Sequence, residues 1–366
     1  MAELKTQEFQ MNMGPHHPST HGVCRFILTM DGEVIVNVEP VIGYLHRALE
    51  KICENRTYVQ CIPIMDRFEY CTSMSCNMVM SLAAEKIGKI EVPERAEYLR
   101  VIMLELNRIA SHLLWLGTTC LDLGALTPFL YVFREREDIL DMFEMTCGQR
   151  LTYNYIRPGG VSKDIPEQFL PKCREFLNKF DACVDDYEKV LTNNPIWRER
   201  NIGVGVLSPE LAIQYGVSGP ALRASGVRFD LRKDDPYSIY DRFDFDIPVT
   251  HNGDCYDRYL VRLVELRQSA RIVRQAIEQI PEGEIKAKVS ANFKPKGEVY
   301  SRIENSRGEL GVYLVGNGDK KPLRVKMRGG SYNHLQVMPE FCKGLKIADL
   351  VAVMASMDVI MPEVDR

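Results

Sequence analysis

Residues 94–115 read ERAEYLRVIMLELNRIASHLLW, and they carry the clearest helical pattern in this chain of 366 residues. Apolar side chains recur there at the three- and four-residue spacing of one buried helix face. They are Leu99, Ile102, Met103, Leu106 and Ile109. Pro93 stands directly before the segment, and proline suits the start of a helix. The segment therefore predicts a long helix in the core of the protein.

The apolar character continues beyond this helix and imitates a membrane span. Between Arg108 and Arg134 the only acidic or basic residue is Asp122. A spanning helix would avoid a carboxylate at its centre and a helix-breaking residue such as Pro128. We therefore expect two elements buried inside protein, with Asp122 near their junction, and no transmembrane segment.

The rest of the chain predicts more helices, with strands near both ends. Strands are expected at 22–42, where Asp31-Gly32 favours a hairpin turn, and at 297–328. Further helical patterns cover 43–90 (with breaks at Pro63 and Gly88), 129–155, 166–191, 253–280 and 339–357.

These patterns favour an α+β protein that is mainly helical, with a helix-bundle core and β-structure near both termini. We expect a single large domain over 1–366, because no linker or repeat interrupts the sequence. Within it, 1–45 form an N-terminal β region. Residues 46–282 form the helical core, which includes an irregular segment at 217–252. Residues 283–366 supply the last strands and the C-terminal helix.

Composition excludes several classes of protein. Hydrophobic residues make up 45% and charged residues 26% of the chain, as in ordinary globular proteins. The net charge of −4 excludes the strongly basic footprint of a general nucleic-acid binder. The eleven cysteines include no C-x-x-C pair, which favours reduced, buried thiols in a cytosolic compartment.

Three further absences narrow the function. The N-terminal sequence MAELKTQEFQMNMG has no apolar core, so no signal peptide is expected. Neither a P-loop nor a complete G-x-G-x-x-G motif is present, so the chain is not expected to bind a nucleotide itself. The G-x-S-x-G and H-E-x-x-H motifs of hydrolases and metalloproteases are also missing.

A histidine-rich loop is the first candidate site. MGPHHPSTHG, residues 13–22, places His16, His17 and His21 between prolines and glycines. Three such imidazoles are potential zinc ligands, although no acidic or thiolate ligand stands beside them in the sequence. The alternatives are a loop with capping histidines, or an exposed and rigidly held histidine that donates a proton or a hydrogen bond.

A second candidate is MDRFEY, residues 65–70. Tyr70 has a polar tip on an apolar ring, which suits a hydrophobic slot with one hydrogen bond. Taken alone, such a tyrosine is more often a core residue than a catalytic one.

Seven motifs in one order give these residues a family context. They are GPHHPSTHG (14–22), MDRFEY (65–70), LDLGALTPF (121–129), YIRPGGV (155–161), GDCYDRY (253–259), RGELGVYLV (307–315) and EVDR (363–366). On these motifs the chain closely resembles, over essentially its whole length, the family of D-type subunits of NADH-quinone oxidoreductases. That family supplies the quinone site of respiratory complex I and is similar in fold to the large subunit of nickel–iron hydrogenases.

The resemblance also implies a difference from the hydrogenases, which hold nickel and iron through two C-x-x-C pairs. Cys76 lies in the first of these regions without a C-x-x-C partner, and no cysteine follows Cys342. Thiolate ligation of those metals is therefore not possible here, and we expect no metal bound by this chain.

The resemblance implies roles for five residues. His21 and Tyr70 are the expected hydrogen-bonding groups at the quinone headgroup, and Asp122 is the expected partner of His21. Arg47 and Arg67 are the expected cations near an iron–sulfur cluster held by a small neighbouring subunit. The chemistry agrees, because quinone reduction builds charge on two carbonyl oxygens that donors stabilise.

The resemblance further implies an assembly and a location. The chain is expected to act only within a proton-pumping NADH:quinone oxidoreductase, with other peripheral-arm subunits and with membrane-arm subunits at the quinone entrance. Those subunits are expected to hold it peripherally on the cytoplasmic side of the cell inner membrane. One alternative is the equivalent subunit of a complex driven by ferredoxin or a reduced deazaflavin, with a quinone or a phenazine as acceptor. The other is a non-catalytic scaffold that retains the hydrogenase shape.

One position departs from the family pattern. Thr152 stands before YIRPGGV where many members have a histidine, which is expected to take up a proton when the neighbouring cluster is reduced. Threonine does not titrate, so the cluster potential is expected to be lower and to suit menaquinone. The alternative is that Thr152 has only a packing role.

Overall fold

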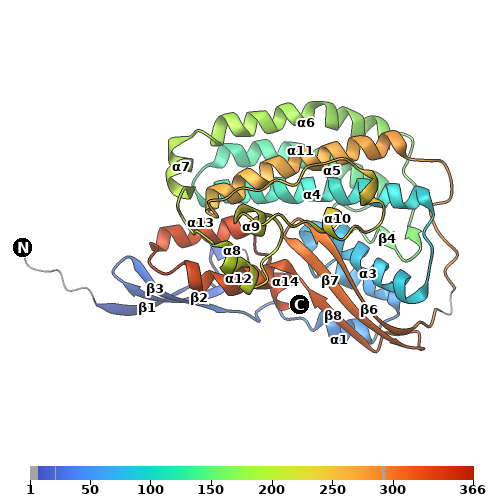
Figure 1. Ribbon diagram of the computed structural model, residues 1–366, viewed down its shortest axis with the longest axis horizontal. Coiled ribbons are helices and arrows are strands. Elements are labelled where there is room, and N and C mark those ends of the chain that lie inside the picture. The colour runs from blue at the N-terminus through green and yellow to red at the C-terminus, as the bar shows by residue number, and fades with distance from the viewer. Residues whose placement is uncertain (1–6, 21, 291–292) are drawn as a thin grey trace, which may run out of the picture.

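The computed structural model describes residues 7–20, 22–290 and 293–366, and long helices form most of it. Figure 1 shows α6 at the outer edge, α5 and α11 beneath it, and α4 next to the rest of the molecule. These helices are α4 (Glu94–Asp122), α5 (Leu126–Cys147), α6 (Phe169–Leu191) and α11 (Cys255–Gln279). The expected mainly helical α+β fold is confirmed.

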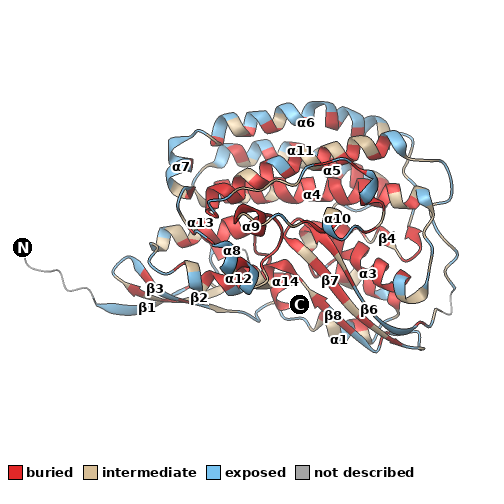
Figure 2. Cartoon of the chain, in the orientation of Figure 1, coloured by how far each residue is buried: buried red, intermediate tan, exposed pale blue. Residues whose placement is uncertain are grey.

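Burial explains why α4 dominates the sequence pattern. Nearly every residue from Ala96 to Cys120 is buried, because α4 packs against α5, α11, α3 (Ser73–Gly88) and α13 (Ile347–Met357). The outer helix α6 is instead buried along one face, and Figure 2 shows its other face exposed.

The apolar stretch between Arg108 and Arg134 is divided as expected. Helix α4 ends at Asp122 and α5 begins at Leu126, and between them Gly124 adopts a positive φ of 84°. Glycine reaches this left-handed conformation without steric cost, so the chain reverses there. Among the residues that the structure describes, no helix has the length and apolar character needed to cross a membrane.

Antiparallel sheets lie near both ends of the described chain. The N-terminal sheet has the order β1-β2-β3 and turns at Asp31-Gly32 as predicted. The C-terminal sheet, β6-β7-β8, packs one face on α3. Their strands are β1 (Glu8–Met13), β2 (Arg25–Asp31), β3 (Val34–Val41), β6 (Lys296–Asn305), β7 (Gly308–Asn317) and β8 (Arg324–Arg328). A two-stranded ribbon, β4 (Ile156–Arg157) and β5 (Gly160–Val161), follows α5.

Short elements complete the described fold. The helices are α1 (Leu49–Glu54), α2 (Tyr58–Met65), α7 (Pro195–Asn201), α8 (Pro209–Gln214), α9 (Gly219–Ala224), α10 (Leu231–Asp234), α12 (Gly330–Phe341) and α14 (Met361–Asp365). Three 3₁₀ turns are η1 (Pro18–Thr20), η2 (Tyr70–Thr72) and η3 (Tyr240–Arg242).

Several predicted boundaries are wrong, and one is the end of the helix expected at 129–155, because α5 stops at Cys147. Pro63 lies inside α2, which begins at a capping box made by Thr57 and Gln60 and tolerates the missing N–H in so short a helix. The helix expected at 339–357 is two helices, α12 and α13, separated by 342–346. Nine of the eleven cysteines are buried, as expected, and none of the eleven forms a disulfide bond in the structure.

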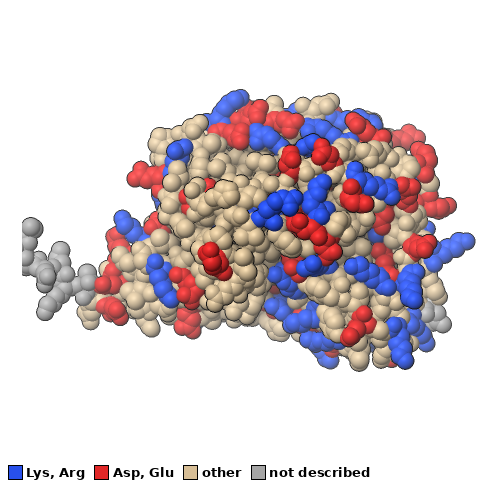
Figure 3. Space-filling view, viewed as in Figure 1, with Lys and Arg blue, Asp and Glu red and all other residues tan. Residues whose placement is uncertain are grey.

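The charge distribution on the visible face is mixed. Figure 3 shows acidic and basic side chains interspersed, with Lys and Arg more frequent toward the sheet β6-β7-β8. On this face, the mixed charges do not form the continuous basic stripe that follows a nucleic-acid backbone.

Candidate functional site

A cavity of about 460 Å³ lies where the 3₁₀ turn η2, the end of α4 and the segment after α13 meet. Its wall is mainly apolar, with a few polar groups that converge on one space. The lining residues are Tyr70, Cys71, Leu114, Trp115, Thr118, Leu121, Asp122, Arg307, Asp358 and Ile360. An apolar slot with few polar groups is the usual form of a site for a flat organic ligand.

Tyr70 opens η2 and is partly buried in this wall. Burial, with smaller contributions from Cys71 and Glu69, raises the pKa of Tyr70 to about 12. The phenol therefore stays protonated at neutral pH and is able to donate a hydrogen bond into the cavity.

Asp122 is the last residue of α4 and lines the same cavity. Asp122 itself is half-buried, although the two elements that meet beside it were expected to be buried inside protein. His21 lies outside the described residues, so its pairing with Asp122 stays a prediction.

The other two histidines of the N-terminal loop are exposed. The Nδ1 atom of His17 accepts the Ser19 backbone N–H at 3.2 Å, which is the capping role considered for this loop. Within residues 7–20, 22–290 and 293–366, no three His, Cys, Asp or Glu side chains are placed to hold a metal ion.

Three buried charged residues, which we call the cavity triad, contact one another at the cavity, and two of them, Arg307 and Asp358, line it. The three are Glu69, Arg307 and Asp358. Arg307 Nη1 lies 3.2 Å from Glu69 Oε1, and Arg307 Nη2 lies 3.0 Å from Asp358 Oδ1. Burial raises the pKa of Glu69 to about 7, although Arg307 opposes this shift. The triad therefore places a carboxyl that titrates near neutrality directly before Tyr70 in the chain.

No role was predicted for the cavity triad from the sequence. Glu69 and Arg307 stand inside the quoted motifs MDRFEY and RGELGVYLV, which was the available signal. Asp358 gave no signal, because it meets Arg307 only through the packing of α13 against the rest of the fold.

Arg47 and Arg67 lie together on the surface and do not line the cavity. Arg47 Nη2 donates to the Arg67 carbonyl oxygen at 2.8 Å, and Arg67 Nη1 donates to the Pro63 carbonyl oxygen at 2.5 Å. In the described part of the chain, neither guanidinium has a carboxylate within 4.0 Å. Their positive charges are therefore available to a neighbouring molecule.

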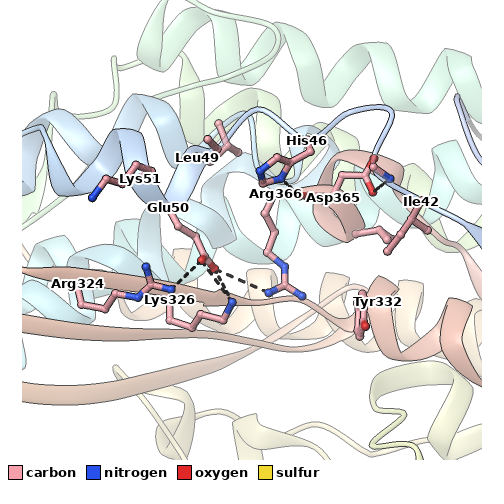
Figure 4. Close-up of a pocket in the computed structure, with 13 residues that line it drawn as sticks. Ile42, His46, Leu49, Glu50, Lys51, Arg324, Lys326, Tyr332, Asp365 and Arg366 are labelled. Atoms are coloured by element: carbon pink, nitrogen blue, oxygen red, sulfur yellow. Dashed lines mark hydrogen bonds and ion pairs between the residues drawn. The ribbon is translucent and has the colours of Figure 1, made fainter.

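A second cavity, of about 390 Å³, lies beside the loop that carries Arg47 (Figure 4). Glu50 faces Lys326 at 3.2 Å, Arg324 at 3.4 Å and Arg366 at 3.8 Å. Asp365 accepts the backbone N–H groups of two loop residues at 2.8 and 2.7 Å. The C-terminal segment therefore fixes the Arg47 loop, and the polar walls suit a flat apolar ligand less well than the first cavity does.

Comparison with known proteins decides the family. The protein-family model of the respiratory-chain NADH dehydrogenase 49 kDa subunit matches residues 122–296 and 288–366 of this chain. The chain belongs to this family.

Full-length relatives agree with the assignment. The D-type subunit of the NADH-quinone oxidoreductase of Dehalococcoides mccartyi is 54% identical over 99% of this chain and 100% of the relative. The D-type subunit of the same enzyme from Clostridium beijerinckii is 51% identical over 100% and 99%. The H-type subunit of the NAD(P)H-quinone oxidoreductase of Thermosynechococcus vestitus is 50% identical, again over 100% and 99%. The predicted family is therefore confirmed over the whole chain.

Proposed function

We propose that this chain is the quinone-binding core subunit of a proton-pumping NADH:quinone oxidoreductase, and that the cavity between Tyr70 and Asp122 receives the quinone headgroup. The observation that carries the proposal is this shared cavity. Two residues assigned from separate motifs line one apolar-walled space together.

The residues of the cavity fit the chemistry of quinone reduction. A quinone takes up two electrons and two protons to become the hydroquinone, and negative charge develops on its carbonyl oxygens. Tyr70 donates a hydrogen bond to one oxygen, and the protonated His21, oriented by Asp122, donates to the other. The apolar walls around Leu114 and Trp115 exclude water, which strengthens both interactions.

The electrons come from an iron–sulfur cluster held by a small neighbouring subunit. Arg47 and Arg67 face that subunit, and their charges raise the reduction potential of its cluster by stabilising the added electron. Leu126 and Leu130 are 59% and 58% exposed one turn apart on α5, and they add an apolar contact for a partner subunit.

Other subunits hold the chain peripherally on the cytoplasmic side of the membrane, with membrane-arm subunits at the quinone entrance. The donor is NADH in the first proposal, and ferredoxin or a reduced deazaflavin in the alternative. A non-catalytic scaffold is disfavoured because Tyr70 and Asp122 border a cavity of suitable size.

Isolation of the complex through a tag on this chain tests the proposal. We expect iron in the complex but not in the isolated chain, and electron transfer to a short-chain quinone from one of the three donors. A photoreactive quinone should label peptides that contain Tyr70 or residues 114–122. Labelling of other subunits alone, or a complex that does not reduce quinone, would contradict the proposal.

A further inference from the structure

Arg262 on α11 is a buried arginine that contacts a wall of the cavity without lining it. Its guanidinium carbon lies 4.3 Å from the centre of the Trp115 ring, and Trp115 lines the cavity. The Trp115 ring is itself fixed, because its Nε1–H donates to the Ala355 carbonyl oxygen at 2.7 Å. Arg262 therefore sits against a rigid wall in a cation–π arrangement.

The positive charge of the Arg262 guanidinium has few hydrogen-bond acceptors and no carboxylate close to it among the described residues. The side chain is 1% exposed, and its one hydrogen bond runs from Nη1 to the Arg258 carbonyl oxygen at 3.0 Å. Among the described residues, Nε and Nη2 have no partner, and no carboxylate lies within 4.0 Å. Burial lowers the pKa of Arg262 to about 10, so the group still carries its charge at neutral pH.

Arg258, one turn earlier on α11, gives the contrast. It is equally buried, but its donors reach Ser356 Oγ and the carbonyl oxygens of Gly253 and Gly205 at 2.8–2.9 Å. A buried arginine with satisfied donors serves packing. An arginine with unsatisfied donors needs another explanation.

Arg262 is attracted by two groups of buried charges. One is the cavity triad, through Asp358, whose Oδ2 atom has no partner within the described residues. The other, which we call the interior network, attracts Arg262 through Glu265. Its members are Glu105, Arg108, His112, Arg223, Asp230, Arg232, Glu265 and Glu304.

Both groups lack one positive charge. With Glu69 ionised, the cavity triad has one more carboxylate than arginine, and so does the interior network when His112 is neutral. Arg262 is thus a cation that neither group holds in an ion pair. Because a buried charge is weakly screened, its field extends to the cavity.

We propose that Arg262 is a positioning residue whose positive charge, applied across the Trp115 ring, favours the electron-rich state of the headgroup bound in the cavity. The proposal rests on the proposed function. The electrons come from the partner's iron–sulfur cluster and the protons from the donors at the headgroup, while Arg262 transfers neither. Its charge acts where negative charge develops on the carbonyl oxygens, which is the interaction that speeds a reaction most.

Two substitutions of similar length separate charge from shape. In the assembled complex, Arg262→Met removes the charge and keeps an unbranched apolar chain, whereas Arg262→Lys keeps the charge. We expect Arg262→Met to lower kcat for quinone reduction roughly tenfold with KM nearly unchanged. Arg262→Lys should stay within about threefold of the parent complex. Arg258→Lys is the control for disturbing a buried arginine on this helix and should leave kcat unchanged.

Equal losses in the Met and Lys variants, or parental kcat in the Met variant, would overturn the inference. If the Met variant fails to assemble, the same comparison is made between Arg262→Lys and Arg262→Gln, since glutamine is neutral but retains donors. Tyr70→Phe separates a failure of the proposed function from a failure of the role of Arg262. Full quinone reduction in Tyr70→Phe would defeat the proposed function. A loss in Tyr70→Phe without one in Arg262→Met would defeat only the role of Arg262.

Discussion

Arg307 and Asp358 are joined at two points: Arg307 Nε donates to the Asp358 carbonyl oxygen at 2.9 Å, and Nη2 lies 3.0 Å from Asp358 Oδ1. The pair links the turn between β6 and β7 to the segment that follows α13. Both residues also line the cavity, so the same contact supports the fold and shapes the site.

The first prediction concerns this contact. Arg307→Met leaves the carboxylates of Glu69 and Asp358 buried without their cation, which should lower the free energy of unfolding by roughly 3–5 kcal/mol. Arg302→Met is the matched control, because Arg302 pairs with Asp235 at the surface and should cost at most about 1 kcal/mol. The urea concentration at which this subunit is half unfolded in the purified complex measures the loss of stability in each variant. Equal midpoint shifts would mean that the triad contributes no special stability.

The second prediction concerns the Tyr70 hydroxyl. Tyr70→Phe keeps the ring in the cavity wall and removes the donor, a loss of about 2–3 kcal/mol in transition-state stabilisation. Quinone reductase activity should fall roughly 30- to 150-fold while the complex still assembles. Tyr313→Phe, at a half-buried tyrosine that bonds Glu298 and does not line the cavity, should leave activity unchanged. Parental turnover in Tyr70→Phe would remove Tyr70 from the site.

The third prediction concerns pH. Asp66 is buried, accepts hydrogen bonds from Asn77 Nδ2 and from the Asn154 backbone N–H, and has its pKa raised by burial from 3.8 to about 7. The unfolded chain therefore ionises Asp66 at a lower pH than the folded chain does. Its contribution to stability is complete below pH 3.8 and is lost as pH rises toward 7.

Asp66→Asn should remove this part of the pH dependence. The free energy of unfolding should then fall less steeply between pH 3.8 and 7 than in the parent protein. Asp164→Asn is the control, because Asp164 is an exposed partner of Arg95. Urea titrations across this range make the comparison, and identical slopes in Asp66→Asn and the parent would contradict the assigned shift.

The fourth prediction concerns attachment to the membrane. The proposal has other subunits holding the chain through exposed groups such as Arg47, Arg67 and Leu126. High-salt or alkaline washing of membranes should therefore release it, because salt screens the charged contacts. An immunoblot of the supernatant measures release. Retention together with the integral subunits would show that the stretch 109–133 was misinterpreted.

The sequence predicted the parts of this protein that depend on local patterns. The long buried helix, the junction of two elements near Asp122 and the hairpin at Asp31-Gly32 each follow from spacing or turn chemistry within a few residues. No role was predicted for Asp358 or Arg262, because the role of each depends on contacts with elements far away in the sequence. A single sequence carries no signal for such pairings.

The candidate site divides in the same way. Tyr70 and Asp122 were assigned through motifs, and the structure brings them to one cavity. Arg47 and Arg67 were also assigned together and lie together, but outside that cavity. The partner of Asp122 in the prediction, His21, lies outside the described residues, and the single-domain organisation stays a prediction.

The last prediction concerns Thr152. This residue has a positive φ of 56°, a conformation that β-branched residues adopt with strain and that histidine tolerates better. Thr152→His should therefore fit the backbone and restore a titratable group at the position where the family resemblance implies a contact with the proposed partner's cluster.

Because threonine does not titrate, the potential of that cluster should change only weakly with pH in the parent complex and more steeply in Thr152→His. Full coupling to one proton corresponds to about 59 mV per pH unit for a one-electron couple. Redox titration of the cluster's paramagnetic signal at several pH values measures the slope. A steep slope in the parent would contradict the prediction and point to another proton carrier.

Asp66 is then the first residue to test, since its carboxylate accepts the Asn154 N–H two residues from Thr152 and its pKa of about 7 lies in the right range. If Asp66 carries the proton, Asp66→Asn should flatten the slope. If the slope stays steep in Asp66→Asn, the carrier lies elsewhere, and His21 becomes the next candidate.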